Sequence, residues 1–184
     1  MSEQHTAGVR PTPRAARRSA RVQGMSGGTV IMDTYRYTLW REWTEALPRL
    51  LFVLLNPSVA DANLDDPTLR RCIGFAQDWC YGSVELANLY AYRATDPRAL
   101  RQVADPVGPL NDYHIQEAAG RADKIVVAWG AEGFLHGRDQ AVLRLLPKPL
   151  WCLGYTLGGA PRHPLYVRRD APLLPYPAIT SGQA

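Results

Sequence analysis

The sequence has few cysteines and no long hydrophobic run. Its three cysteines, Cys72, Cys80 and Cys152, are an odd number, and no two of them form a Cys-x-x-Cys pair. A disulfide framework or a cysteine-bound zinc or iron–sulfur centre is therefore not expected. No apolar run approaches the roughly 20 residues that span a bilayer, and no apolar segment of a secretory signal follows the N-terminal arginines. We expect a soluble cytoplasmic protein with reduced thiols and without metal, cofactor or membrane partner.

The chain beyond its first residues also lacks an excess of charge of either sign. The net charge is +4, and residues 1–28 account for all of it. Their charged side chains are Arg10, Arg14, Arg17, Arg18 and Arg21 against Glu3. We expect this segment to be a disordered tail, with Met25 as an alternative start. Proteins that grip duplex DNA by its phosphates usually carry positive charge on the folded body, which is not the pattern here.

What the sequence does contain is an alternation of strand-like and helix-like segments. Residues 35–40 are expected to be an antiparallel edge strand. A continuous apolar run, typical of a strand covered on both faces, occupies 50–55, and further buried strands are expected over 84–87, 124–128 and 150–153. Helices are expected from Pro67, with Asp66 as N-cap, and over 110–121 and 138–146. This order predicts one α/β domain over 29–170 with a parallel sheet, followed by an irregular tail over 171–184.

Polar or turn-forming residues follow each buried strand. Asn56 follows the first strand, Asn88 the second, Trp129-Gly130 the third, and a loop over 155–166 the fourth. In an open parallel sheet all the carboxyl ends lie on one side, where ligands bind. We therefore expect these four segments to meet at one crevice.

Six short segments of the chain carry a family resemblance. They read YRYTLWR, LLNPSVADANLDDPTLRRC, ANLYAYRATDP, DPVGPLND, VVAWGAEG and GAPRHPLY. Together, over residues 35–166, they resemble a bacterial family catalogued as domain of unknown function 1643. That resemblance implies no activity.

The order of motifs at the strand ends is similar to a second, more distant group, the uracil-DNA glycosylase superfamily. Residues 54–58 resemble the Gly-Ile-Asn-Pro-Gly motif of its mismatch-specific branch, and residues 163–166 partly match the His-Pro-Ser-Pro motif of another branch. The resemblance implies a three-layer α/β/α sandwich around a four-stranded parallel sheet, to which the N-terminal edge strand would be added. Members of that superfamily recognise a base and cleave its bond to the sugar.

By this resemblance, Asn56 would position a water molecule and His163 would stabilise the departing base. An amide cannot accept a proton as a carboxylate can, so Asp61, Asp65 or Asp66 would have to assist, and Asp61 is taken as the third catalytic residue. The other interpretation is that Asn56 forms a turn and Asp66 only caps a helix.

The remaining candidates would hold the ligand. Asn88 would read the edge of the base, since an amide offers both a donor and an acceptor. Pro57, Ser58 and Tyr90 are the other expected base-binding residues. The expected phosphate-binding residues are Arg70, Arg71, Arg93 and Arg162. Each of these residues also has an ordinary interpretation, as a turn, core or solvated surface residue.

The sequence also departs from the superfamily pattern. Ser58 stands where the mismatch-specific branch has glycine, no glycine precedes Asn56, and the Ser-Pro after His-Pro is missing. The leading hypothesis is a protein that binds a nucleobase, nucleoside or nucleotide, free or in nucleic acid, and hydrolyses its N-glycosidic bond. The alternatives are a non-catalytic nucleotide-binding or modified-base-binding module, or a different reaction on the same scaffold. The base, the oligomeric state and catalysis itself stay open.

Overall fold

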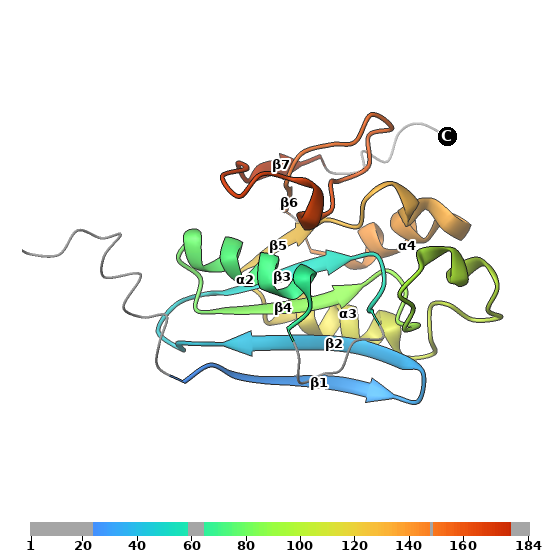
Figure 1. Ribbon diagram of the computed structural model, residues 1–184, viewed down its shortest axis with the longest axis horizontal. Helices are drawn as coiled ribbons and strands as arrows, with labels where there is room; N and C mark the ends of the chain where they lie inside the picture. The colour runs from blue at the N-terminus through green and yellow to red at the C-terminus, as the bar shows by residue number, and fades with distance from the viewer. Residues whose placement is uncertain (1–23, 59–64, 148, 178–184) are drawn as a thin grey trace, which may run out of the picture.

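The aliphatic runs form the centre of a mixed sheet in the computed structural model, which describes residues 24–58, 65–147 and 149–177 (Figure 1). The sheet of these residues has seven strands in the order β1-β2-β4-β3-β5-β6-β7. The strands are β1 Ser26–Met32, β2 Tyr35–Glu42, β3 Arg49–Leu54, β4 Ser83–Asn88, β5 Lys124–Val127, β6 Leu150–Cys152 and β7 Leu174–Tyr176. The helices are α2 Pro67–Asp78, α3 Asn111–Gly120 and α4 Arg138–Leu145, with short 3-10 turns η2 Pro97–Arg101, η3 Ala131–Gly137 and η4 Pro164–Tyr166.

The four apolar strands run parallel, as their sequence pattern predicts. β3 pairs in parallel with β4 on one side and with β5 on the other, and β5 pairs in parallel with β6. The antiparallel strands β1, β2 and β7 extend the sheet at its two edges. The chain therefore moves from β3 to one neighbour and later returns to the other. Such a reversal of strand order is where open α/β sheets bind ligands, beyond the carboxyl ends of the strands.

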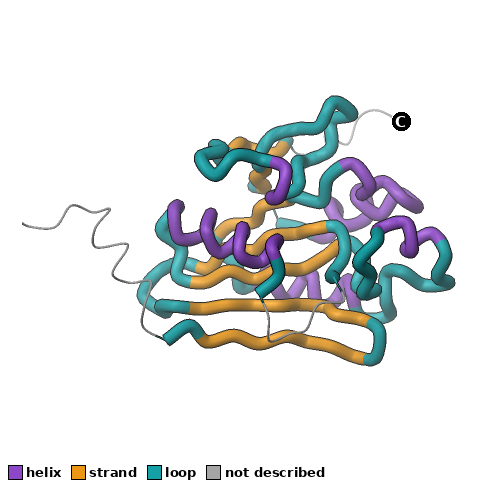
Figure 2. The backbone as a smooth tube through the Cα atoms, viewed as in Figure 1, coloured by secondary structure: helices purple, strands orange, loops and turns teal. Residues whose placement is uncertain are grey.

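Helices cover both faces of this sheet (Figure 2). Alternate residues of β3 point to opposite faces: Leu50 and Phe52 pack with α2, and Leu51 and Val53 pack with α3 and α4. The helix α2 contributes five buried residues to its face, Leu69, Cys72, Ile73, Phe75 and Ala76. We call these two sides the α2 face and the α3 face.

The start of α2 confirms the expected cap. The side chain of Asp66 accepts a hydrogen bond of 2.7 Å from the backbone N–H of Leu69, and Pro67 occupies the first turn, where no amide donor is needed. The N-terminus of α2 therefore lies at the carboxyl end of the sheet, directly after the loop that leaves β3.

The strand β2 differs from the expected edge strand in two ways. It lies second from the edge, because β1 pairs with it across a hairpin, and it contains a bulge opposite Val30 and Ile31. A regular strand would place Tyr37 and Leu39 on one face, and the bulge places them on opposite faces. Tyr37 stacks on His114 of α3 at 4.7 Å, whereas Leu39 belongs to the α2 cluster.

Both ends of the described chain are more ordered than the sequence pattern predicts. β1 begins at Ser26, inside the segment expected to be a disordered tail, and β7 pairs with β6 inside the expected C-terminal irregular tail. These strands are short or weakly apolar, so their own side-chain pattern does not predict them. Backbone pairing with β2 and β6 stabilises them instead. Residues 1–23 and 178–184 lie outside the described part. No helix in the described ranges is long and apolar enough to cross a membrane.

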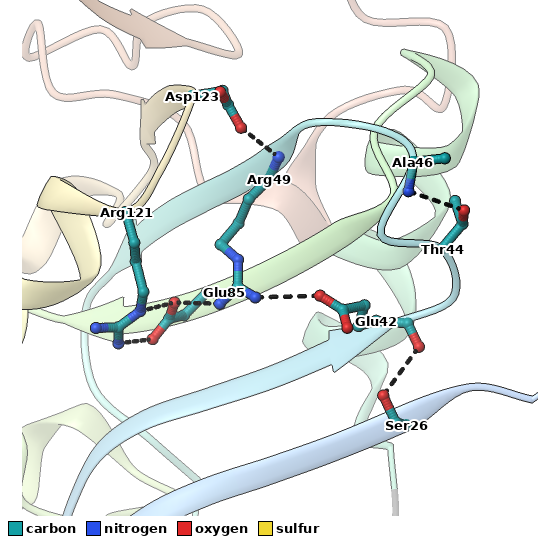
Figure 3. A network of polar contacts seen from close by, with 8 residues as sticks. All are labelled: Ser26, Glu42, Thr44, Ala46, Arg49, Glu85, Arg121 and Asp123. Atoms are coloured by element: carbon teal, nitrogen blue, oxygen red, sulfur yellow. Dashed lines mark hydrogen bonds and ion pairs between the residues drawn. The ribbon is translucent and has the colours of Figure 1, made fainter.

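An ion network around one buried carboxylate closes the amino end of the sheet (Figure 3). Glu85 of β4 is fully buried and accepts two hydrogen bonds, of 2.9 and 2.5 Å, from the guanidinium of Arg121. Arg49 of β3 bridges Glu85 and Glu42. The backbone N–H of Arg49 also donates to Asp123, at 2.7 Å. These charges fix the strands at the end opposite to the carboxyl ends.

Candidate functional site

The loop that leaves β3 is tied to the segment that leaves β4. The side-chain amide nitrogen of Asn56 donates a hydrogen bond of 2.7 Å to the backbone oxygen of Ala94, and the N–H of Ala94 donates to the oxygen of Pro57 at 2.9 Å. The amide of Asn56 therefore has a structural task, although it joins a distant segment rather than forming the local turn that was the other interpretation. Its nitrogen is engaged by Ala94, so its oxygen is the atom left to accept from a ligand or water.

The same loop reaches the N-terminus of α2 through Ser58. The hydroxyl of Ser58 donates to one carboxylate oxygen of Asp66 at 2.9 Å, while the other oxygen caps the helix at Leu69. Asp66 thus joins the end of β3 to α2 and holds a negative charge there.

His163 lies in the loop after β6, close enough to Asp66 for the charge of Asp66 to act on it. Its ring nitrogen Nδ1 accepts from the N–H of Leu165 at 3.3 Å, and a Cβ added at Gly130 would lie 3.6 Å from the His163 Cβ. The N–H of Gly130 donates to Pro161 at 2.8 Å, which joins the end of β5 to this loop. The glycine has a positive φ of 79°, a conformation that favours glycine. The ends of β3 and β5 and the loop after β6 therefore converge.

The environment of His163 keeps its ring neutral. Burial lowers the pKa of His163 to about 4, and the carboxylate of Asp66 opposes this shift only in part. Because Nδ1 accepts a hydrogen bond, the proton of the neutral ring resides on Nε2. His163 is thus a neutral hydrogen-bond donor at neutral pH.

Asn88 ends the strand next to β3. It stands opposite Leu54 in the register and is 3% exposed. Because it follows Leu86 of the α2 cluster by two residues on the same strand, its side chain lies on the α2 face. Its backbone oxygen accepts from the side chain of the fully buried Asn111, at 3.0 Å. Asn111 was not expected from the sequence, and it holds the end of β4 in place from the α3 face.

Arg36 is a second residue that the sequence did not indicate. The rings of Tyr35 and Tyr37, its neighbours, stack on each other on the α3 face, so Arg36 between them points to the α2 face. It is 5% exposed, and its Nε has no hydrogen-bond partner among the described residues. Burial lowers the pKa of Arg36, and the charge of Asp66 opposes that effect.

A signal for Arg36 existed in the sequence, namely a charged side chain between two tyrosines at the start of the strand. It could not be used, because the bulge decides which face the side chain enters, and the side-chain pattern alone does not reveal a bulge.

Several predicted residues lie elsewhere. Tyr90 is fully buried on the α3 face, where its hydroxyl donates to the oxygen of Leu135 at 2.7 Å, and burial raises its pKa to about 12. Arg162 is exposed and donates to Tyr155. Tyr90 therefore offers no stacking face in this structure, and Asp61 falls outside the described residues.

The other three predicted arginines surround α2 or the loop after β4. Arg70 donates to the backbone oxygen of Asp65, and Arg71 donates to the backbone oxygens of Pro164 and Val167. The backbone N–H of Arg93 donates to Thr34 at 3.0 Å. In the described ranges no three His, Cys, Asp or Glu side chains gather as a metal site requires.

Residues at or just beyond the carboxyl ends of the parallel strands define what we call the edge site: Asn56, Ser58, Asp66, Asn88, Gly130 and His163, with Arg36 near enough to Asp66 for their charges to interact. The set combines an uncharged N–H donor, a carboxylate, primary amides and a guanidinium. A ligand with both donors and acceptors on one flat edge, together with a negative charge, matches this combination.

Comparisons with known proteins give a family and no activity. Neither a curated protein nor a solved structure matches the chain. The family described as "Protein of unknown function (DUF1643)" matches residues 36–165, which hold every residue of the edge site, and this is well over half of the chain. The chain belongs to that family.

Proposed function

We propose that the edge site binds a nucleobase, as part of a nucleoside, a nucleotide or a nucleic acid strand, and that it hydrolyses the N-glycosidic bond. The proposal follows the likeness of the strand-end motifs to the uracil-DNA glycosylase superfamily. It is supported by the four parallel strands between two helical layers and by the order of Asn56, Asn88, Gly130 and His163 at their carboxyl ends.

The observation that carries the proposal is the state of His163. A neutral imidazole that accepts at Nδ1 has an Nε2–H that can donate to a ligand, and His163 lies near Asp66 and the end of β5. A departing base gains negative charge on its carbonyl oxygens, and a preorganised donor that gives up no proton stabilises that charge.

The hydrolysis would proceed with these roles. The oxygen of water bonds to the anomeric carbon of the sugar, the bond from that carbon to the base nitrogen breaks, and the base leaves with the electron pair. The proton lost by water ends on the base. Asn56 would orient the water through its side-chain oxygen, Asn88 would hold the edge of the base, and His163 would stabilise the anion until it is protonated.

A second candidate, a binding module without hydrolysis, has a specific observation in its favour. Both carboxylate oxygens of Asp66 already accept hydrogen bonds, from Leu69 and Ser58, and the amide nitrogen of Asn56 is used by Ala94. Among the described residues, these contacts leave Asp66 poorly placed to accept a proton from water.

Base release separates the two candidates. Purified full-length protein is incubated with oligonucleotides that contain uracil, mismatched thymine or hypoxanthine, and with free nucleotides, and the released base is measured by chromatography. Hydrolysis predicts release that falls at least about 100-fold in Asn56→Ala and His163→Ala. His136→Asn, on an exposed turn, serves as the matched control. Binding without release supports the module, and activity that survives both substitutions contradicts the assignment of the site.

A further inference from the structure

A pocket of about 170 Å³ lies beside α2, and its lining includes no residue of the edge site. It is lined by Arg70, Arg71, Gly74, Phe75 and Arg169. The pocket adjoins the segment that follows His163, because Arg71 donates to the backbone oxygens of Pro164 and Val167. Its space exceeds several-fold the roughly 30 Å³ that one water molecule occupies in the liquid, so a group of the size of phosphate fits.

The positive charge of the pocket is only partly balanced. Arg70 and Arg71 use backbone oxygens as partners, and neither has a carboxylate within 4.0 Å in the described part of the chain. Arg169 pairs with Asp78, at 3.1 Å, and both side chains are exposed. Three guanidinium groups therefore meet one carboxylate, and the excess charge favours an anion.

Gly74 is the second feature that points to a ligand. Glycine in the interior of a helix costs about 1 kcal/mol relative to alanine, so its presence calls for a reason. Close packing does not supply one, since a Cβ added at Gly74 would meet nothing within 4 Å. The missing side chain instead leaves the floor of the pocket open between the arginines.

We propose that this pocket binds a phosphate group, with Arg70, Arg71 and Arg169 as its ligands and Gly74 as the opening. The inference deepens the proposed function and rests on it only for the source of the phosphate: a nucleotide whose base occupies the edge site. Planar guanidinium groups suit the oxygens of a phosphate, and the ring of Phe75, 5.1 Å from the Arg71 guanidinium carbon, holds that side chain in place.

The test is a calorimetric titration of the full chain with inorganic phosphate, nucleoside 5′-monophosphates and a short single-stranded oligonucleotide. Gly74→Glu places a carboxylate in the pocket, and Gly74→Gln places a neutral side chain of the same size there. We expect Gly74→Glu to weaken phosphate binding at least tenfold, and Gly74→Gln to weaken it less. Both variants should melt no lower than the unaltered chain, because each replaces a helical glycine by a better helix former.

Two further variants control for charge and for structure. Gly120→Glu adds the same charge at a helix position on the α3 face, where a Cβ also meets nothing, and should leave phosphate binding unchanged. Arg169→Gln removes one exposed ligand and should weaken binding about threefold to tenfold. If Gly74→Glu and Arg169→Gln bind phosphate as the unaltered chain does, or if none of the three probes binds, the proposal is wrong.

The outcomes also separate this proposal from the proposed function. If inorganic phosphate binds in the pocket and the monophosphates bind no more tightly, the phosphate site stands and the nucleobase site fails. If the monophosphates bind and Gly74→Glu has no effect on their affinity, the nucleobase site stands and the phosphate site fails. Tight binding of the oligonucleotide alone would identify a strand, rather than a free nucleotide, as the source of the phosphate.

Discussion

At the scale of single residues, two basic side chains, the half-buried His163 and the buried Arg36, set the character of the edge site. His163 is held as a neutral donor by burial, and Arg36 is held as a buried cation without a hydrogen bond to its Nε among the described residues. Neither arrangement is what stability alone favours, because burying an imperfectly paired polar group costs free energy. Proteins commonly keep such arrangements where a ligand completes them.

His163 should make the stability of the protein depend on pH. The unfolded chain binds a proton at this residue below about pH 6.5, whereas the folded chain does so only below about pH 4. Between these values the unfolded state binds more protons, so the free energy of unfolding rises as the pH rises. We expect a contribution on the order of 2 kcal/mol between pH 4.5 and 7.5, measured by urea unfolding, that His163→Gln removes and His136→Asn keeps. An identical pH dependence in His163→Gln would contradict this account.

Arg36 should matter for ligand binding more than for folding. Burying a guanidinium whose Nε has no hydrogen-bond partner among the described residues costs free energy, so Arg36→Met should change the free energy of unfolding by less than about 1 kcal/mol. Binding of nucleoside monophosphates should fall at least tenfold in calorimetry. Arg41→Met is the matched control on the same strand. It breaks the ion pair with Asp65, whose N–O distance is 2.9 Å, and should cost more stability. A variant Arg36→Met that unfolds readily would show that the residue is structural.

At the scale of elements, the N-terminus of α2 organises the edge site. Asp66 caps the helix, accepts from Ser58, and lies close enough to Arg36 and His163 for its charge to act on both. One residue therefore links the end of β3, the helix and the loop after β6.

Asp66→Asn should separate the helix-capping role of Asp66 from the effect of its negative charge. Asparagine caps helices about as well as aspartate, so the variant should lose less than about 1 kcal/mol of stability, whereas Asp66→Ala should lose about that much or more. Without the carboxylate the pKa of His163 should fall further, because the group that raises it is gone. Imidazole resonances followed by NMR against pH would measure this, and a pKa that rises in Asp66→Asn would contradict the assignment.

The sequence predicts these elements well where the local signals are strong. The four apolar runs, the Asp66-Pro67 start of α2 and the polar residues at the strand ends all follow from patterns within a few residues. It fails where a partner decides the structure. β1 and β7 exist because β2 and β6 offer unpaired edges, and Arg36 faces α2 because of a bulge. Tyr90 lies just after the end of β4, which Asn88 closes, yet its side chain packs in the cluster on the α3 face.

At the scale of the whole molecule, the two ends of the sheet have different tasks. The amino end holds the Glu85 network, which joins β2, β3, β4 and the end of α3. The carboxyl end holds the edge site. A sheet that is fixed firmly at one end can carry imperfectly paired polar groups at the other.

Glu85→Ala should therefore lower the stability of the protein without changing its affinity for the ligand. Removing the buried carboxylate leaves the partly exposed cations of Arg49 and Arg121 without their shared acceptor, and we expect a loss of about 1.5–3 kcal/mol in urea unfolding. In conditions where the variant stays folded, its affinity for monophosphates should equal that of the unaltered chain. An affinity that falls in parallel with stability would show that the two ends are coupled.

The central claim is that side chains from separate loops hold one nucleobase, and the ¹⁵N resonance of the His163 imidazole tests it most directly. We predict that saturating nucleoside monophosphate shifts the Nε2 signal of His163 and that Asn88→Ala weakens this response at least tenfold, while the His136 signal stays in place. A His163 signal that does not move while the same nucleotide binds elsewhere on the chain would contradict the account.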